Sequence, residues 1–165
     1  MANTSTTGAA GEHYVMCQLL RRGLIAALAP TGVPNADIIV TDEIGDKLCA
    51  VQVKTRLKPG SDKGWHMSVK HERIISPNIY YCFVGFETQP PGCWIMPSDV
   101  VADVLKRSHA HWLAQPGKNG QAHKENDMRR LCESYDHENF LPEFSLGWLD
   151  PYKDRWDLLE AATKE

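Results

Sequence analysis

The stretch that most restricts the fold is residues 37–56, DIIVTDEIGDKLCAVQVKTR, which has the pattern of two β-strands joined by a tight polar turn. Residues 37–40 are β-branched and apolar after the opening aspartate, and residues 48–55 are mostly apolar. Residues 42–47, between them, are rich in types that favour turns. The sequence therefore predicts an antiparallel hairpin.

Polar side chains interrupt this hairpin where apolar ones are expected. Gln52 and Lys54 lie two residues apart, so they share one face of the second strand. If the hairpin turns about Ile44 and Gly45, Asp37 lies directly opposite Gln52 and projects on the same side. An acid, an amide and an amine then meet on one patch of the sheet, whereas a shift of one residue in register would separate them.

A helix before the hairpin supplies a further acid. Residues 7–22 have helical periodicity, and Glu12 lies in register with the apolar stripe that begins at Val15. A carboxylate on a core-facing stripe needs a partner, because an unpaired buried charge is costly. Two partners are open for Glu12: a metal ion shared with Asp37, or a salt bridge to an arginine or to Lys54.

The order of these groups resembles that of a known superfamily of nucleases. A helix glutamate, an aspartate at a strand start and a hairpin into (D/E)-x-K is the order of the PD-(D/E)XK superfamily, and the chain looks like one of its small prokaryotic endonuclease-like members. The segments that carry the resemblance are GAAGEHYVMCQLLRRG, PNADIIV and AVQVKTR. Two departures are the spacing of Pro34 from Asp37 and the glutamine, Gln52, at the (D/E) position.

The resemblance implies an α/β fold with a restriction-endonuclease-like core, in which helices flank a mixed β-sheet. It implies hydrolysis of phosphodiester bonds in DNA with Mg²⁺ (or Mn²⁺) as cofactor. Asp37 would be the main metal ligand, with Glu12, the amide oxygen of Gln52 and the backbone carbonyl of Val53 as further oxygen ligands. Lys54 would orient the attacking water, so that Glu12, Asp37, Gln52 and Lys54 form the catalytic set.

The alternative is a protein with this fold that has lost turnover and acts as a nucleic-acid-binding or protein-interaction module. Gln52 keeps this alternative open, because an amide carries no negative charge for the metal. Lys54 and Glu12 favour the enzyme. Taken one at a time, each of these residues is more often a turn residue, a half-exposed strand residue or a salt-bridge partner.

Charge is distributed unevenly along a chain whose net charge is −3. Residues 54–73 have a net charge of +4 and residues 123–165 a net charge of −5. The basic stretch begins at the candidate site, which favours a DNA-contacting surface with Arg56, Lys58 and Lys63 as its residues. The alternative is a hairpin with ordinary solvated lysines.

The remaining elements follow from apolar runs and capping residues. Strands are predicted at residues 24–29, 65–69, 79–86 and 93–96, with Trp65 in the core and a flexible, substrate-contacting loop at 58–64. A helix capped by Ser98 is expected to reach residue 113, and a last helix is expected to begin at Asp150. Residues 125–148 have no decisive periodicity.

The composition indicates a single domain over residues 1–165, because the chain is long enough to bury a core. There is no signal-like start and no apolar run of membrane-spanning length, so we expect a cytoplasmic protein without membrane contact. Five cysteines in mostly apolar runs indicate reduced thiols. A homodimer would suit the cutting of two DNA strands, but no self-complementary patch is evident in the sequence.

Two further motifs are weak. Several histidines and one cysteine invite a zinc site, but their spacing fits no known finger or ribbon. These residues are His109, His111, His123, Cys132 and His137. The GAAG segment before Glu12 is better explained by close backbone packing than by phosphate binding.

Overall fold

The computed structural model describes residues 3–60, 63–117, 119–135 and 141–164. In chain order, its elements are α1 (Thr4–Arg21), β1 (Ile25–Leu28), β2 (Ile38–Thr41), β3 (Leu48–Arg56), β4 (Gly64–Ser68), the 3₁₀ turn η1 (Val69–Glu72), β5 (Ile79–Gly85), β6 (Gly92–Pro97), α2 (Ser98–Ala114), β7 (Met128–Cys132), the 3₁₀ turns η2 (Pro142–Phe144) and η3 (Asp150–Tyr152), and α3 (Asp157–Lys164). The four strands predicted outside the hairpin are confirmed as β1, β4, β5 and β6.

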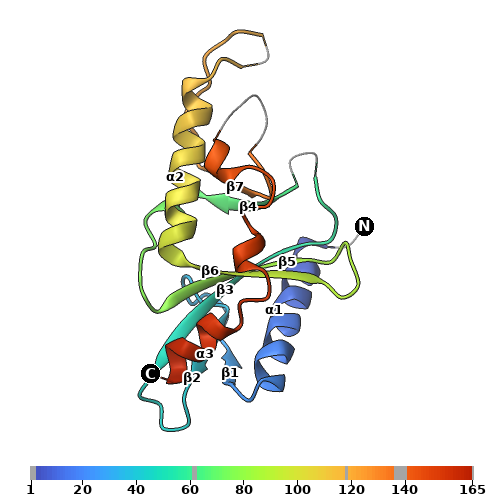
Figure 1. Ribbon diagram of the computed structural model, residues 1–165, viewed down its shortest axis with the longest axis vertical. Coiled ribbons are helices and arrows are strands. Elements are labelled where there is room, and N and C mark those ends of the chain that lie inside the picture. Colours follow the sequence, from blue (N-terminus) through green and yellow to red (C-terminus); the bar gives the residue numbers. More distant parts are fainter. Residues whose placement is uncertain (1–2, 61–62, 118, 136–140, 165) are drawn as a thin grey trace.

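The main sheet has five strands in the order β1-β2-β3-β5-β6. β3 and β5 are parallel, and every other neighbouring pair is antiparallel, so the sheet is mixed. A second, two-stranded antiparallel sheet joins β4 to β7. Figure 1 shows α1 and α3 with β1 and β2 at one end of the molecule, and α2 with the β4–β7 ribbon at the other. The predicted α/β fold, a mixed sheet flanked by helices, is confirmed.

The β2–β3 hairpin has the register that the sequence predicts. Ile38 pairs with Val51 and Thr41 with Leu48, the register that a turn about Ile44 and Gly45 gives. The backbone N–H of Asp37 donates over 2.9 Å to the carbonyl of Val51, which is the partner of Ile38, so Asp37 lies in a β-bulge at the end of the ladder. Its side chain still reaches Gln52, whose amide donates to it. The turn about Ile44 and Gly45 is therefore correct, and with it the meeting of Asp37 and Gln52.

Each face of the main sheet carries its own core. The core beneath α1 and α3 includes Val15, Leu19, Val51, Val53, Cys82, Ile95 and Leu159. The core beneath α2 and the β4–β7 ribbon includes Trp65, Tyr81, Phe83, Met96, Leu105 and Leu131. Alternation along β3 therefore directs Val51 and Val53 to the first core and Gln52, Lys54 and Arg56 to the second side. Trp65 is a core residue, as predicted.

Close packing brings α1 onto β3. A Cβ atom at Gly11 would lie 1.9 Å from Oγ1 of Thr55, so only glycine allows this approach. This confirms that the GAAG segment serves backbone packing, through its second glycine. The helix begins at Thr4, three residues before the predicted start, because the side chain of Asn3 caps it by accepting from the N–H of Ser5.

Two predictions about the later helices are wrong in detail. Ser98 is the first residue of α2 rather than its cap, and its hydroxyl instead bonds the N–H and C=O of Ser76, each over 2.9 Å. The last helix begins at Asp157, because the chain makes only a 3₁₀ turn at Asp150 and then adopts a left-handed conformation at Asp154, where φ is 53°. Such a conformation ends a right-handed helical turn.

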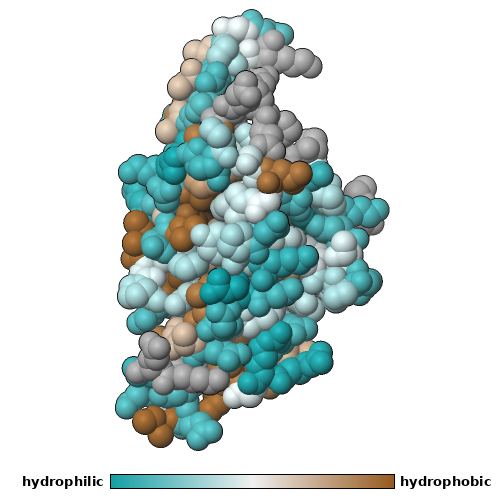
Figure 2. Space-filling view, viewed as in Figure 1, coloured by the Kyte–Doolittle hydropathy of each residue, from teal (hydrophilic) through white to brown (hydrophobic). Residues whose placement is uncertain are grey.

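Other features of the described residues bear on the class of protein. No helix in the described part of the chain is long and apolar enough to cross a membrane. All five cysteines are free, and four of them are buried. Figure 2 shows a face that is mostly polar, with hydrophobic residues in small, separate areas.

Candidate functional site

Asp37, the residue before β2, is held in place by its neighbours on β3. Its Oδ2 atom accepts a hydrogen bond from the backbone N–H of Val53 over 2.7 Å and a second, short one from the side-chain amide of Gln52. Both donors lie just beyond the end of the β2 ladder, where the two strands separate. Two hydrogen bonds on one oxygen fix the carboxylate and leave its Oδ1 atom for another partner.

The orientation of Gln52 differs from the role predicted for it. The amide presents its NH₂ group, not its oxygen, to Asp37, and the residue is only 7% exposed. In this arrangement Gln52 orients the aspartate. A role as metal ligand stays a prediction, and it requires the amide to turn over so that the oxygen faces the cation.

Glu12 lies near Asp37, as the helix register predicted. Burial raises the pKa of the Glu12 carboxyl, the negative charge of Asp37 raises it further, and His13 acts in the opposite direction. Within the described residues, neither carboxylate has an ion-pair partner, so the predicted alternative of a salt bridge to Lys54 or an arginine is not found there. Two neighbouring carboxylates that form no ion pair repel each other, and a bound cation would relieve that repulsion.

Lys54 lies on the same face of β3 as Gln52 and is half-buried. Burial lowers the pKa of its ammonium group, Asp37 raises it, and Lys70 lowers it. No ion pair to Lys54 occurs among residues 3–60, 63–117, 119–135 and 141–164. Asp37 is thus the common neighbour of the predicted catalytic residues, since Gln52 bonds it and its charge acts on the pKa of both Glu12 and Lys54.

The structure adds His71 and Tyr81, which sequence reasoning did not assign to the site. The Nδ1 atom of His71 lies 2.8 Å from the hydroxyl of Tyr81, and Tyr81 is the neighbour of Gln52 in the β3–β5 register. His71 is buried, and its pKa is lowered to about 4 by burial and by the charges of Lys54 and Lys70. No sequence pattern identifies His71, because η1 directly follows β4 and its position depends on the pairing of β4 with the distant strand β7.

Arg56 was predicted to contact DNA, and its environment in the structure does not suit that role. The side chain is 6% exposed, forms ion pairs with Glu87 and Glu133, and stacks on Trp65 with 3.9 Å between Cζ and the ring centroid. Its guanidinium also donates to the carbonyl of Lys63. With two carboxylates already bound, this charge is unavailable to a phosphate, so Arg56 is a structural residue.

The other two predicted DNA contacts, Lys58 and Lys63, are exposed on the segment between β3 and β4. Residues 61–62 of the predicted flexible loop lie outside the described residues, as does His137 of the weak zinc motif. In the described part of the chain, no group of three or more His, Cys, Asp and Glu side chains could hold a metal ion. A cation at Asp37 and Glu12 would therefore need amide, carbonyl or water oxygens as well.

Comparisons with known proteins bear on the fold. No family model matches the chain, and no curated protein matches it. Among solved structures, the chain is similar to the bacterial homing endonuclease I-Ssp6803I, with a TM-score of 0.52 and 16% sequence identity. The match covers 96% of this chain and 92% of that one. At this identity the likeness shows a shared, nuclease-like fold.

Proposed function

We propose that this protein is a divalent-metal-dependent endonuclease that hydrolyses phosphodiester bonds in DNA, with a Q-x-K variant of the PD-(D/E)XK motif. The observation that carries the proposal is an Asp37 carboxylate fixed at the end of the β2–β3 ladder, close enough to Glu12 and to Lys54 for its charge to act on the pKa of each. Among the described residues, neither acid forms an ion pair with a cation, and Lys54 forms none with an anion. The nuclease-like fold and the likeness to a homing endonuclease support it.

The residues present fit a hard divalent cation. Asp37 offers its Oδ1 atom, since Oδ2 already accepts from Val53 and Gln52, and Glu12 offers a second carboxylate. The Val53 carbonyl leaves β3 on the same edge as its N–H, which points to Asp37, so it adds a neutral oxygen. Mg²⁺ suits such a set, because it takes one or two carboxylates and retains several waters.

When bound, the cation would activate water and neutralise charge on the phosphate. Lys54 would bind a non-bridging oxygen of the phosphate or the attacking water, and its charge offsets the charge that develops there. Burial lowers the pKa of Lys54, which makes its ammonium a better proton donor than a solvated lysine. Gln52 would keep the Asp37 carboxylate aligned through its amide hydrogen bond.

The second candidate function is a nuclease-like protein without turnover that binds nucleic acid or another protein. One observation favours it: Gln52 stands where a carboxylate would help to hold the cation, and it is already hydrogen-bonded to Asp37.

Cleavage of plasmid, linear and branched DNA tests the proposal. The wild type is incubated with Mg²⁺, with Mn²⁺ and with EDTA, beside Asp37→Ala and the control Asp46→Ala, which removes an exposed acid from the β2–β3 turn. We expect metal-dependent cleavage by the wild type and the control and none by Asp37→Ala. Equal traces for all three proteins in every metal would rule out the enzyme and leave the binding module.

A further inference from the structure

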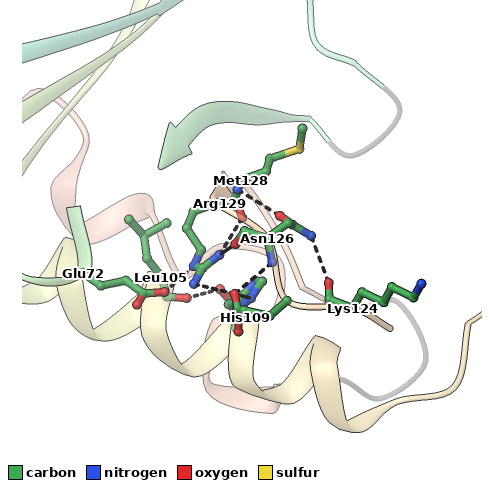
Figure 3. A network of polar contacts seen from close by, with 9 residues as sticks. Glu72, Leu105, His109, Lys124, Asn126, Met128 and Arg129 are labelled. Carbon is green, nitrogen blue, oxygen red and sulfur yellow. Dashed lines mark hydrogen bonds and ion pairs between the residues drawn. The ribbon is translucent and has the colours of Figure 1, made fainter. Parts of the chain in front are cut away.

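The turn η1, which carries Lys70 and His71, is held firmly on one side by Arg129 of β7. The Nε atom of Arg129 donates to Glu72 in a short ion pair, and its Nη1 atom donates to the carbonyls of Asn126 and Met128 over 2.6 and 2.9 Å. Figure 3 shows the guanidinium of Arg129 in the middle of these groups, above α2. Arg129 is 4% exposed, so these contacts are shielded from water.

The network extends to α2. The Nη2 atom of Arg129 lies 3.2 Å from Oε1 of Glu125. The same oxygen lies 2.7 Å from Nε2 of His109 on α2. A buried ion pair is weak evidence for stability, because replacing it by apolar residues often stabilises a protein. Its role can instead be to select one arrangement of the elements that it joins. The arrangement specified here is the placement of η1.

Two more contacts hold the other side of η1. The N–H of Val69 donates to the carbonyl of Asp127 over 2.9 Å, and His71 is bonded to Tyr81, the neighbour of Gln52 on β5. Anchors therefore exist at the first, third and fourth residues of the turn. Lys70, the second residue, is the exposed one, and its side chain is directed by a backbone that cannot easily move.

This placement brings two like charges together. Lys70 directly precedes His71, which is bonded to Tyr81 beside Gln52, so η1 lies next to the strand that carries Lys54. In agreement with this placement, the charge of Lys70 acts on the pKa of both Lys54 and His71. Neither lysine has an ion-pair partner in the part of the chain that the structure describes. Holding two ammonium groups close costs free energy, and a bound anion would remove that cost.

We propose that Lys70 is a second phosphate-binding residue of the site, which contacts the DNA backbone beside Lys54 and is positioned there by the Arg129–Glu72 ion pair. This rests on the proposed function, since it names a further substrate contact of the same site. In this role Lys70 takes the place predicted for Arg56, whose charge is neutralised within the fold, as a further cation beside Lys54.

The test is a salt titration of DNA binding. A fluorescent duplex is bound to the wild type, Lys70→Met, Lys70→Arg and Lys106→Met, in EDTA and again in Ca²⁺, with anisotropy as the readout. Lys106 is an exposed lysine on α2 and serves as the matched control. Each phosphate contact contributes about 0.9 to the slope of log K against log salt, so Lys70→Met should lower the slope by about 0.9.

We expect Lys70→Met to bind several-fold more weakly than the wild type, Lys70→Arg to restore the slope, and Lys106→Met to leave it unchanged. Failure of the wild type to bind DNA in either buffer would overturn this inference together with the proposed function. Binding by the wild type with the same slope for Lys70→Met and Lys106→Met would overturn the inference alone. Unfolding midpoints are measured for all four proteins, and equal midpoints would show that a change of slope does not come from a loss of stability.

Discussion

Lys54 and Arg56 lie two residues apart on the same face of β3, and their surroundings are opposite. Arg56 is enclosed by Glu87, Glu133 and the ring of Trp65, so its charge is satisfied within the protein. Lys54 has no such partner among the described residues, and Lys70 adds a second positive charge nearby.

The difference separates two uses of a buried cation. A charge that is paired and hydrogen-bonded on every side joins elements of the fold, as Arg56 joins β3 to the segments that carry Glu87 and Glu133. A half-buried charge left without a partner raises the free energy of the folded protein until a ligand supplies one. The first contributes to stability and the second to binding, and the two uses predict different effects of mutation.

The largest effect is expected at Lys54. Lys54→Ala should lower the rate of DNA cleavage by about 10³-fold, because it removes the group that offsets charge on the phosphate. The free energy of unfolding should change by less than about 1 kcal/mol, since no ion pair is lost. Cleavage rates and urea unfolding of the same preparations provide the measurement. A large loss of stability with normal cleavage by the folded fraction would show that Lys54, like Arg56, serves the fold and not binding.

Arg56 should show the opposite result. Arg56→Met should lower the free energy of unfolding by about 3 kcal/mol, because it leaves two carboxylates without their cation in a partly buried position. Cleavage by the folded fraction should stay within a few-fold of the wild type. The control is Arg107→Met, which breaks more exposed ion pairs with Asp103 and Glu143 and should cost less than about 1 kcal/mol. Equal losses in both variants would contradict the assignment.

Acid should destabilise the Lys54 side of the sheet through His71. The pKa of His71 is about 4 in the folded protein, below its ordinary value of 6.5, so the unfolded chain binds the proton first. Stability is therefore complete above about pH 6.5 and falls as the pH falls toward 4, by about 2 kcal/mol between pH 7.5 and pH 5. Denaturant unfolding at the two pH values measures this loss.

The matched variant for this prediction is His71→Gln, which keeps a hydrogen-bonding group beside Tyr81 but does not titrate. We expect its stability to change with pH by about 2 kcal/mol less than that of the wild type. The same pH dependence in both proteins would show that His71 is not held in its neutral form.

The smallest effect is expected at Gln52. Gln52→Glu should raise the affinity for Mn²⁺ about tenfold, because a third carboxylate beside Asp37 and Glu12 adds attraction for the cation and repulsion without it. Calorimetric titration with Mn²⁺ measures the change. Weaker binding by this variant would show that position 52 does not face the cation.

Local patterns predicted the hairpin half of the site. Alternation along residues 48–55 and the turn about Gly45 were sufficient to predict that the side chains of Asp37 and Gln52 meet, because register in a short hairpin is set by its turn. The bulge that turns the backbone of Asp37 toward Val51 was not predicted. The helical period likewise placed Glu12 toward the core. These contacts connect segments close in sequence or follow a single period, so a sequence contains the information directly.

The rest depends on partners that are distant in sequence. Arg56 reads as a DNA-binding cation until Glu133, 77 residues later, is placed against it. β7, MRRLC, was not predicted because two consecutive arginines interrupt its alternation, and one of them, Arg129, is buried by its pairing with Glu72. No local pattern reports such a tertiary ion pair, and the role of η1 follows from it.

The central claim is that Asp37 and Glu12 share one divalent cation beside Lys54. A crystal structure of the protein soaked with Mn²⁺ tests it most directly, through the anomalous signal of the metal. The account predicts one strong peak in contact with Oδ1 of Asp37, the Glu12 carboxylate and the Val53 carbonyl. A strong peak elsewhere with none between Asp37 and Glu12, or no peak at saturating Mn²⁺, would contradict it.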